Sequence, residues 1–106
     1  MDLTNIFFHD SEIIRVIEEA QSGDLFMEVE YPTDWEHNVF EPRRLVFRDV
    51  LEYEVHEGPI EGRPTILSAH EVAQQEERSL LRIDTTAGFR QLLCSSVELL
   101  PPIGKV

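Results

Sequence analysis

Residues 34–38 form the densest group of side chains that could do chemistry. They read Asp-Trp-Glu-His-Asn, which places two carboxylates and an imidazole close together. Imidazole and carboxylate groups are ligands that zinc and non-haem iron accept. No second histidine stands at a spacing that would hold two ligands on one element, because His9, His56 and His70 are scattered along the chain. Residue types without such spacing do not define a metal site, so we expect no metal ion and no cofactor.

A second polar group, His9-Asp10-Ser11, precedes the first regular element. Its residue types are those of a base, an orienting acid and a nucleophile, but a catalytic triad is defined by spatial geometry rather than by adjacency in sequence. The chain contains no Gly-x-Ser-x-Gly elbow, and its glycines form no phosphate-binding loop. Polar residues in this position commonly bond local backbone amides in a cap or turn. We therefore expect no catalytic residue here.

The elements that must position these side chains are β-strands. Apolar and charged residues alternate over 25–31 and 51–56, and a period of two places one set against a core and the other in water. Further short apolar segments, each bounded by turn residues, lie at 43–49, 65–72, 79–85, 89–94 and 97–100. This pattern predicts one mainly β domain over residues 1–106, an antiparallel sandwich or partly open barrel of six to eight short strands.

The segment 11–21 has two interpretations. Its apolar residues fall on one arc of a helical wheel, which would give an α+β domain with one N-terminal helix. Four of its five apolar residues are β-branched, however, and the turn sequence Ser22-Gly23-Asp24 leads directly into the next strand. We favour a β-hairpin and keep the helix as the alternative.

The alternation also predicts which side chains form the core. The buried face should carry Leu25, Met27, Val29, Leu45, Phe47, Leu51, Tyr53, Leu81 and Ile83. Cys94, with Leu92 and Leu93 beside it, is expected to be a small buried hydrophobe. Proline ends the strand at Pro32 because it lacks a ladder donor, so Pro32–Pro42 is expected to be an irregular loop.

The charge balance limits the classes of partner. The chain has 21 Asp and Glu against 9 Lys and Arg, a net charge of −12. Phosphate contacts need clustered basic residues, so nucleic acid is not an expected partner. No apolar stretch approaches the roughly 20 residues that span a bilayer, and the start of the chain does not read as a signal peptide. We therefore expect a cytoplasmic protein with no membrane partner.

Two segments carry a resemblance to known proteins. Phe8-His9-Asp10-Ser11, followed by Ile13-Ile14 and the 25–29 strand, resembles small bacterial β-rich proteins with an N-terminal His-Asp-small-residue motif. Residues 34–38 and 44–47 look like the same class, so the resemblance covers about the first half of the chain. Some of these proteins are grouped with immunity proteins of bacterial toxin systems. The resemblance implies a bacterial, cytoplasmic, β-rich protein and supplies no catalytic residue.

These observations favour a non-enzymatic acidic protein that binds a basic protein partner, with immunity-type inhibition as its most specific form. A field of net negative charge accelerates encounter with a cationic surface. The expected binding residues are Trp35, Glu36, His37, Phe40 and His9. For a lone Trp in a small domain, however, we favour the interpretation in which Trp35 folds inward and covers one end of the core.

Two other functions remain open at this stage. A small enzyme or ligand carrier would have a pocket at the open end of the sheet, lined by His9, His37 and His56. A homodimer would pair exposed strand edges. A deep apolar pocket lined by histidine would favour the enzyme, and a flat acidic face around Trp35 would favour the binding protein.

Overall fold

The protein is a β-sandwich. Its computed structural model describes residues 1–59 and 61–102, and every regular element among them is a strand. The strands are β1 (Glu12–Glu19), β2 (Asp24–Asp34), β3 (Val39–Arg48), β4 (Leu51–Glu57), β5 (Ile66–Gln75), β6 (Arg78–Thr85), β7 (Gly88–Cys94) and β8 (Ser96–Leu99). All neighbouring strands are antiparallel. The predicted mainly β fold is therefore confirmed.

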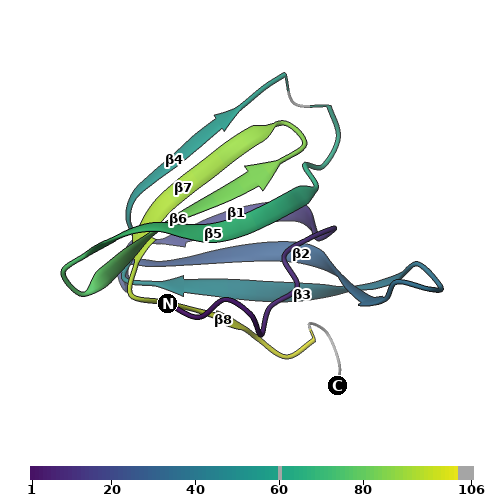
Figure 1. The fold of residues 1–106 in the computed structure, drawn as a ribbon, viewed down its shortest axis with the longest axis horizontal. Coiled ribbons are helices and arrows are strands. Elements are labelled where there is room, and N and C mark those ends of the chain that lie inside the picture. Colours follow the sequence, from purple (N-terminus) through teal and green to yellow (C-terminus); the bar gives the residue numbers. More distant parts are fainter. Residues whose placement is uncertain (60, 103–106) are drawn as a thin grey trace.

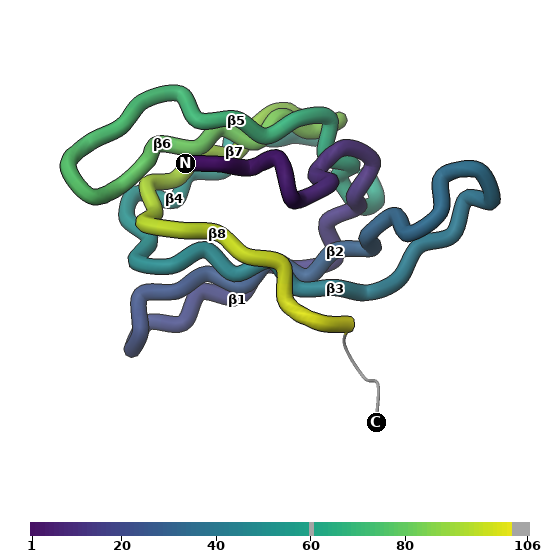
Figure 2. Tube along the Cα trace, turned by 60° about the horizontal axis from the view of Figure 1, so that its bottom comes forward, coloured from purple at the N-terminus to yellow at the C-terminus, as the bar shows by residue number. Residues whose placement is uncertain are grey.

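The eight strands form two sheets, with orders β1-β2-β3-β8 and β4-β7-β6-β5. Figure 1 shows the strands of the two sheets crossing obliquely, and Figure 2 shows the two layers with the N-terminal segment running between β5 and β8. The sheets do not close into a barrel. Over the described ranges 1–59 and 61–102, the chain has no helix long and apolar enough to cross a membrane.

The core lies between the two sheets and follows the predicted alternation. Seven of the nine residues expected there are buried: Leu25, Met27, Val29, Leu45, Phe47, Leu81 and Ile83. Cys94 is buried as well, and burial raises the pKa of its thiol to about 11. Tyr53 is only partly buried against the core. Leu51 is 48% exposed, so its assignment to the core was wrong.

The segment 11–21 is a strand and a turn, not a helix. β1 pairs with β2 from Glu12 opposite Glu30 to Glu19 opposite Asp24, as the hairpin interpretation predicts. The turn closes at Gly23, whose φ of +78° is a left-handed conformation that glycine adopts without strain. The Gly23 amide donates to the Glu19 carbonyl at 2.9 Å.

Three of the edge strands are interrupted by bulges. The register shifts between Ile13 and Arg15 in β1, between Leu51 and Glu54 in β4, and at two places in β5. The bulge in β4 contains Glu52 at a φ of +53° and changes which residues face inward, which explains the exposure of Leu51. Bulged edges are poor templates for another strand.

The expected loop at Pro32–Pro42 is instead a β-hairpin. β2 continues to Asp34 and β3 begins at Val39, with Pro32 opposite Phe40 in the ladder. Beyond Glu30, β1 no longer pairs with β2, and β8 pairs with β3 only at residues 45–48. The extension is therefore a two-stranded ribbon that projects from the sandwich (Figure 1). A proline fits there because a ribbon needs ladder donors on one side only.

Candidate functional site

The tip of the β2–β3 hairpin holds Trp35 in the open. The turn spans residues 35–38, with the Asn38 amide donating to the Trp35 carbonyl at 3.3 Å and Asn38 at a φ of +55°. The His37 amide donates to Asp34 Oδ1 at 3.3 Å, which fixes the start of the turn. Trp35 is 54% exposed. The interpretation of Trp35 as a cover for the core is therefore wrong.

Trp35 is part of an exposed aromatic pair. Phe7, from the segment before β1, meets Trp35 edge to face with ring centroids 5.0 Å apart and is itself 52% exposed. The Phe7 amide donates to the Tyr31 hydroxyl at 2.8 Å, which ties this segment to the base of the hairpin. The pair presents apolar surface that the fold leaves in water, the usual mark of an interaction site when it is contiguous.

A hollow lies between the hairpin and the start of β1. It has a volume of about 610 Å³ and is lined by His9, Asp10, Glu12, Trp35, Asn38, Phe40 and Thr65. The pairing of Glu12 with Glu30 places the residues before β1 beside the base of the hairpin. A smaller hollow of about 320 Å³ shares His9 and Trp35 and is also lined by Phe7 and Leu67. Trp35 thus lies at the border of both hollows.

The carboxylates around Trp35 have no arginine partner among the described residues. Across residues 1–59 and 61–102, the arginine–carboxylate ion pairs are Arg15 and Arg44 with Glu28, Arg43 with Glu41, Arg48 with Asp24 and Glu98, Arg82 with Asp84, and Arg90 with Glu57. Asp10 lies near His9 at 3.4 Å, and Asp34 near His37 at 2.7 Å. The paired arginines therefore neutralise other carboxylates, and none of them neutralises the carboxylates at the end of the hairpin.

The structure brings some of the predicted site residues together. Trp35, Phe40 and His9 all line the larger hollow. Glu36 and His37 lie on the exposed turn and are not among its lining residues. Sequence reasoning missed Phe7, which stands one residue before the Phe8 that the core buries. The doubled phenylalanine was the available signal, because the core takes only one of the two rings.

The turn also carries three side chains that could act as metal ligands. The ligand atoms of Asp34, Glu36 and His37 lie within 4.8 Å of one another. All three side chains are exposed, and His37 Nδ1 already lies 2.7 Å from Asp34 Oδ2. Such a set could hold a divalent cation only in competition with water and with its own hydrogen bond, so it supports no metal centre.

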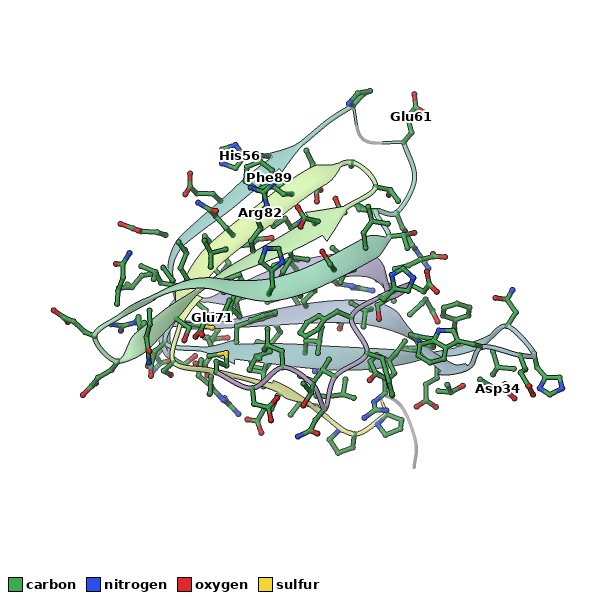
Figure 3. The ribbon with its side chains drawn as sticks, viewed as in Figure 1. Asp34, His56, Glu61, Glu71, Arg82 and Phe89 are labelled. Atoms are coloured by element: carbon green, nitrogen blue, oxygen red, sulfur yellow. The ribbon has the colours of Figure 1, made fainter. Side chains whose placement is uncertain are left out.

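The histidines expected in a catalytic pocket lie on separate elements. His9 Nδ1 is 2.9 Å from the Leu67 carbonyl, and His37 is on the hairpin turn. His56 on β4 stacks against Phe89 on β7 with centroids 4.7 Å apart, on the opposite side of Phe89 from Arg82 (Figure 3). Within the part of the chain that the structure describes, no hydrogen bond or ion pair joins these imidazoles.

One charged group is buried between the sheets. The Arg90 guanidinium donates from Nε and Nη2 to the two carboxylate oxygens of Glu57, each at 2.8 Å, and from Nη1 to the Tyr53 hydroxyl at 3.0 Å. Thr85 Oγ1 also donates to Glu57 at 2.9 Å. The Glu57 side chain has no exposed surface and that of Arg90 is 10% exposed. The group satisfies its own charges and holds β4, β6 and β7 together, which is a structural role.

Comparison of the chain with family models, with curated proteins and with solved structures gives no match. The resemblance to immunity-type proteins therefore stays a prediction, and the geometry around Trp35 has to carry the functional argument.

Proposed function

We propose that the chain is a non-enzymatic binding protein that recognises a basic protein partner through the hairpin end of the sandwich. The observation that carries the proposal is the exposure of Trp35 and Phe7, an aromatic pair displayed at a projecting hairpin. Large aromatic side chains supply most of the binding energy in many protein interfaces. About half of each ring remains exposed to water, where a partner can cover it.

The sign of the partner's charge follows from the residues around the pair. Asp10, Glu12, Asp34 and Glu36 surround the aromatic residues, and no arginine among the described residues pairs with them. A cationic surface would be attracted to this end and an anionic one repelled. An immunity-type inhibitor, which neutralises a basic protein by covering it, would act through such a surface.

A peptide-display selection tests the proposal without knowledge of the partner. A random peptide library is selected on the immobilised protein and counter-selected on the Trp35→Ala variant. We expect the enriched peptides to be rich in Arg and Lys beside apolar residues. Their affinity should fall by about 2 kcal/mol or more in Trp35→Ala, as it does for aromatic hot spots.

Leu51→Ala is the matched control, since Leu51 is 48% exposed but lies on β4, in the other sheet. The selected peptides should bind this variant as they bind the unchanged protein. Peptides without basic residues, or peptides whose binding is insensitive to Trp35, would contradict the proposal.

A further inference from the structure

The larger hollow beside Trp35 contains aromatic and acidic groups, and His9 lies 3.4 Å from the Asp10 carboxylate at its edge. Trp35 and Phe40 contribute rings, and Asp10 and Glu12 contribute carboxylates. No lysine or arginine lines it among the described residues. Trp35 lines both hollows, whereas Phe7 lines only the smaller one.

At another place in the protein, an aromatic ring and a carboxylate both contact an arginine of the same chain. The Arg82 guanidinium lies 3.9 Å from the Phe89 ring centroid, and its Nε donates to Asp84 Oδ1 at 2.9 Å. The hydrogen bond from Arg82 lowers the pKa of the Asp84 carboxyl below its ordinary value. Figure 3 shows Arg82 and Phe89 together on the outer face of the second sheet.

A second example lies at the base of the hairpin. The Arg43 guanidinium is 5.4 Å from the Tyr31 ring centroid and 3.2 Å from Glu41 Oε1. In both examples the guanidinium lies over an aromatic ring, and one of its nitrogen atoms contacts a carboxylate. These are the two interactions that a planar, delocalised cation makes at once.

We infer that the hollow lined by Trp35, Glu12 and Asp10 is the anchor site for an arginine side chain of the partner. The inference rests on the proposed function and names the chemical group that the site takes. Arginine fits better than lysine because its planar head stacks on a ring while its N–H groups reach carboxylates in the same plane. The volume of about 610 Å³ is large enough for an arginine side chain.

The experiment follows a capped tetrapeptide with one arginine by NMR. The probe is acetyl-Gly-Arg-Gly-Gly-amide, and its matched control carries citrulline, which has the same shape without the charge. Trp35 is the chain's single tryptophan and gives one indole N–H resonance. We expect a saturable shift of that resonance with the arginine peptide and at least about tenfold weaker binding of the citrulline peptide, in line with the loss of both a cation–π contact and an ion pair.

Two charge variants separate a local contact from the overall field. Glu12→Gln removes a carboxylate of the hollow, and Glu54→Gln removes one on β4. Both change the net charge by the same amount. We expect Glu12→Gln to weaken the arginine peptide about fivefold, the upper range for a surface ion pair, and Glu54→Gln to leave it unchanged. Equal effects of the two variants, equal binding of the citrulline peptide, or no saturable shift would each overturn the inference.

The display selection and the arginine probe fail independently. Peptides that depend on Trp35 but contain lysine and no arginine would support the proposed function and overturn the arginine anchor. Binding of the arginine peptide at Trp35, with no peptide enriched by the selection, would support the anchor and overturn the broader function.

Discussion

The buried pair of Glu57 and Arg90 makes the most exacting prediction about stability. Arg90 donates three hydrogen bonds, two to Glu57 and one to Tyr53. Arg90→Met removes all three hydrogen bonds. The Glu57 side chain has no exposed surface, and Thr85 Oγ1 would be its remaining side-chain donor. Breaking a buried ion pair on one side costs about 3–5 kcal/mol. That is a large part of the roughly 5–15 kcal/mol by which small domains are stable.

Urea unfolding followed by far-ultraviolet circular dichroism measures the change. With a slope of about 2 kcal/mol per molar urea, a loss of about 4 kcal/mol moves the midpoint by about 2 M. The double variant Glu57→Met with Arg90→Met should regain much of the loss, because an apolar replacement of both partners leaves no buried charge. A cost below about 1 kcal/mol for Arg90→Met, or a double variant less stable than the single one, would refute the reasoning.

The same pair predicts a pH dependence of defined sign. Burial alone raises the pKa of Glu57, but the hydrogen bonds from Arg90 and Thr85 and the charge of Arg90 outweigh it and hold the pKa below the ordinary 4.5. The unfolded chain therefore takes up this proton first as the pH falls, so the stabilisation is complete above about pH 4.5 and is lost through the folded-state pKa. The double Met variant should lose less stability than the unchanged protein over this range in the same urea assay.

Three further predictions concern single side chains. Trp35→Ala should lower the free energy of unfolding by about 1 kcal/mol, the value of its edge contact with Phe7, and the indole fluorescence of the unchanged protein should be open to a soluble quencher. A blue-shifted, quencher-resistant emission would contradict the exposure of Trp35. Phe47→Ala should cost about 3–5 kcal/mol in urea unfolding because its ring has no exposed surface, and a cost near that of Trp35→Ala would show that the ring is not in the core. Cys94, buried with a pKa of about 11, should react with dithionitrobenzoate at pH 8 only as fast as the molecule opens; reaction at the rate of a free thiol would show that it is accessible.

The predictability of the fold differed between regular and bulged strands. Where alternation is unbroken, as in β6, the sequence predicted the buried face correctly. In β1, Ile13 and Val16 both pack toward the core although they are three residues apart, because the bulge inserts Ile14 between them. A spacing of three is also the spacing of a helix face. A bulged strand and a helix therefore share this pattern, and the β-branched residues and the turn at Ser22-Gly23-Asp24 distinguished them.

The candidate site was predictable in its residues more than in its geometry. Trp35 and Phe40 stood out as aromatic residues in a polar segment, and the structure places both at one hollow with His9. The carboxylate of Glu12 reaches this hollow through the β1–β2 ladder, a long-range pairing that local patterns do not encode. Phe7, the ring partner of Trp35, lines the smaller hollow. The buried position of Glu57 was missed for a related reason, since a carboxylate on an alternating strand is assigned to water unless its arginine partner is known.

The projecting β2–β3 hairpin separates specificity from folding. The four residues of the turn, 35–38, are all exposed, while the core residues of the same strands lie from Leu25 to Tyr31 and from Leu45 to Phe47. The turn can therefore change its composition without disturbing the packing between the sheets. Related chains could in this way acquire different partners on one scaffold, and a library varied at these positions could retarget the protein while the core between the sheets stays intact.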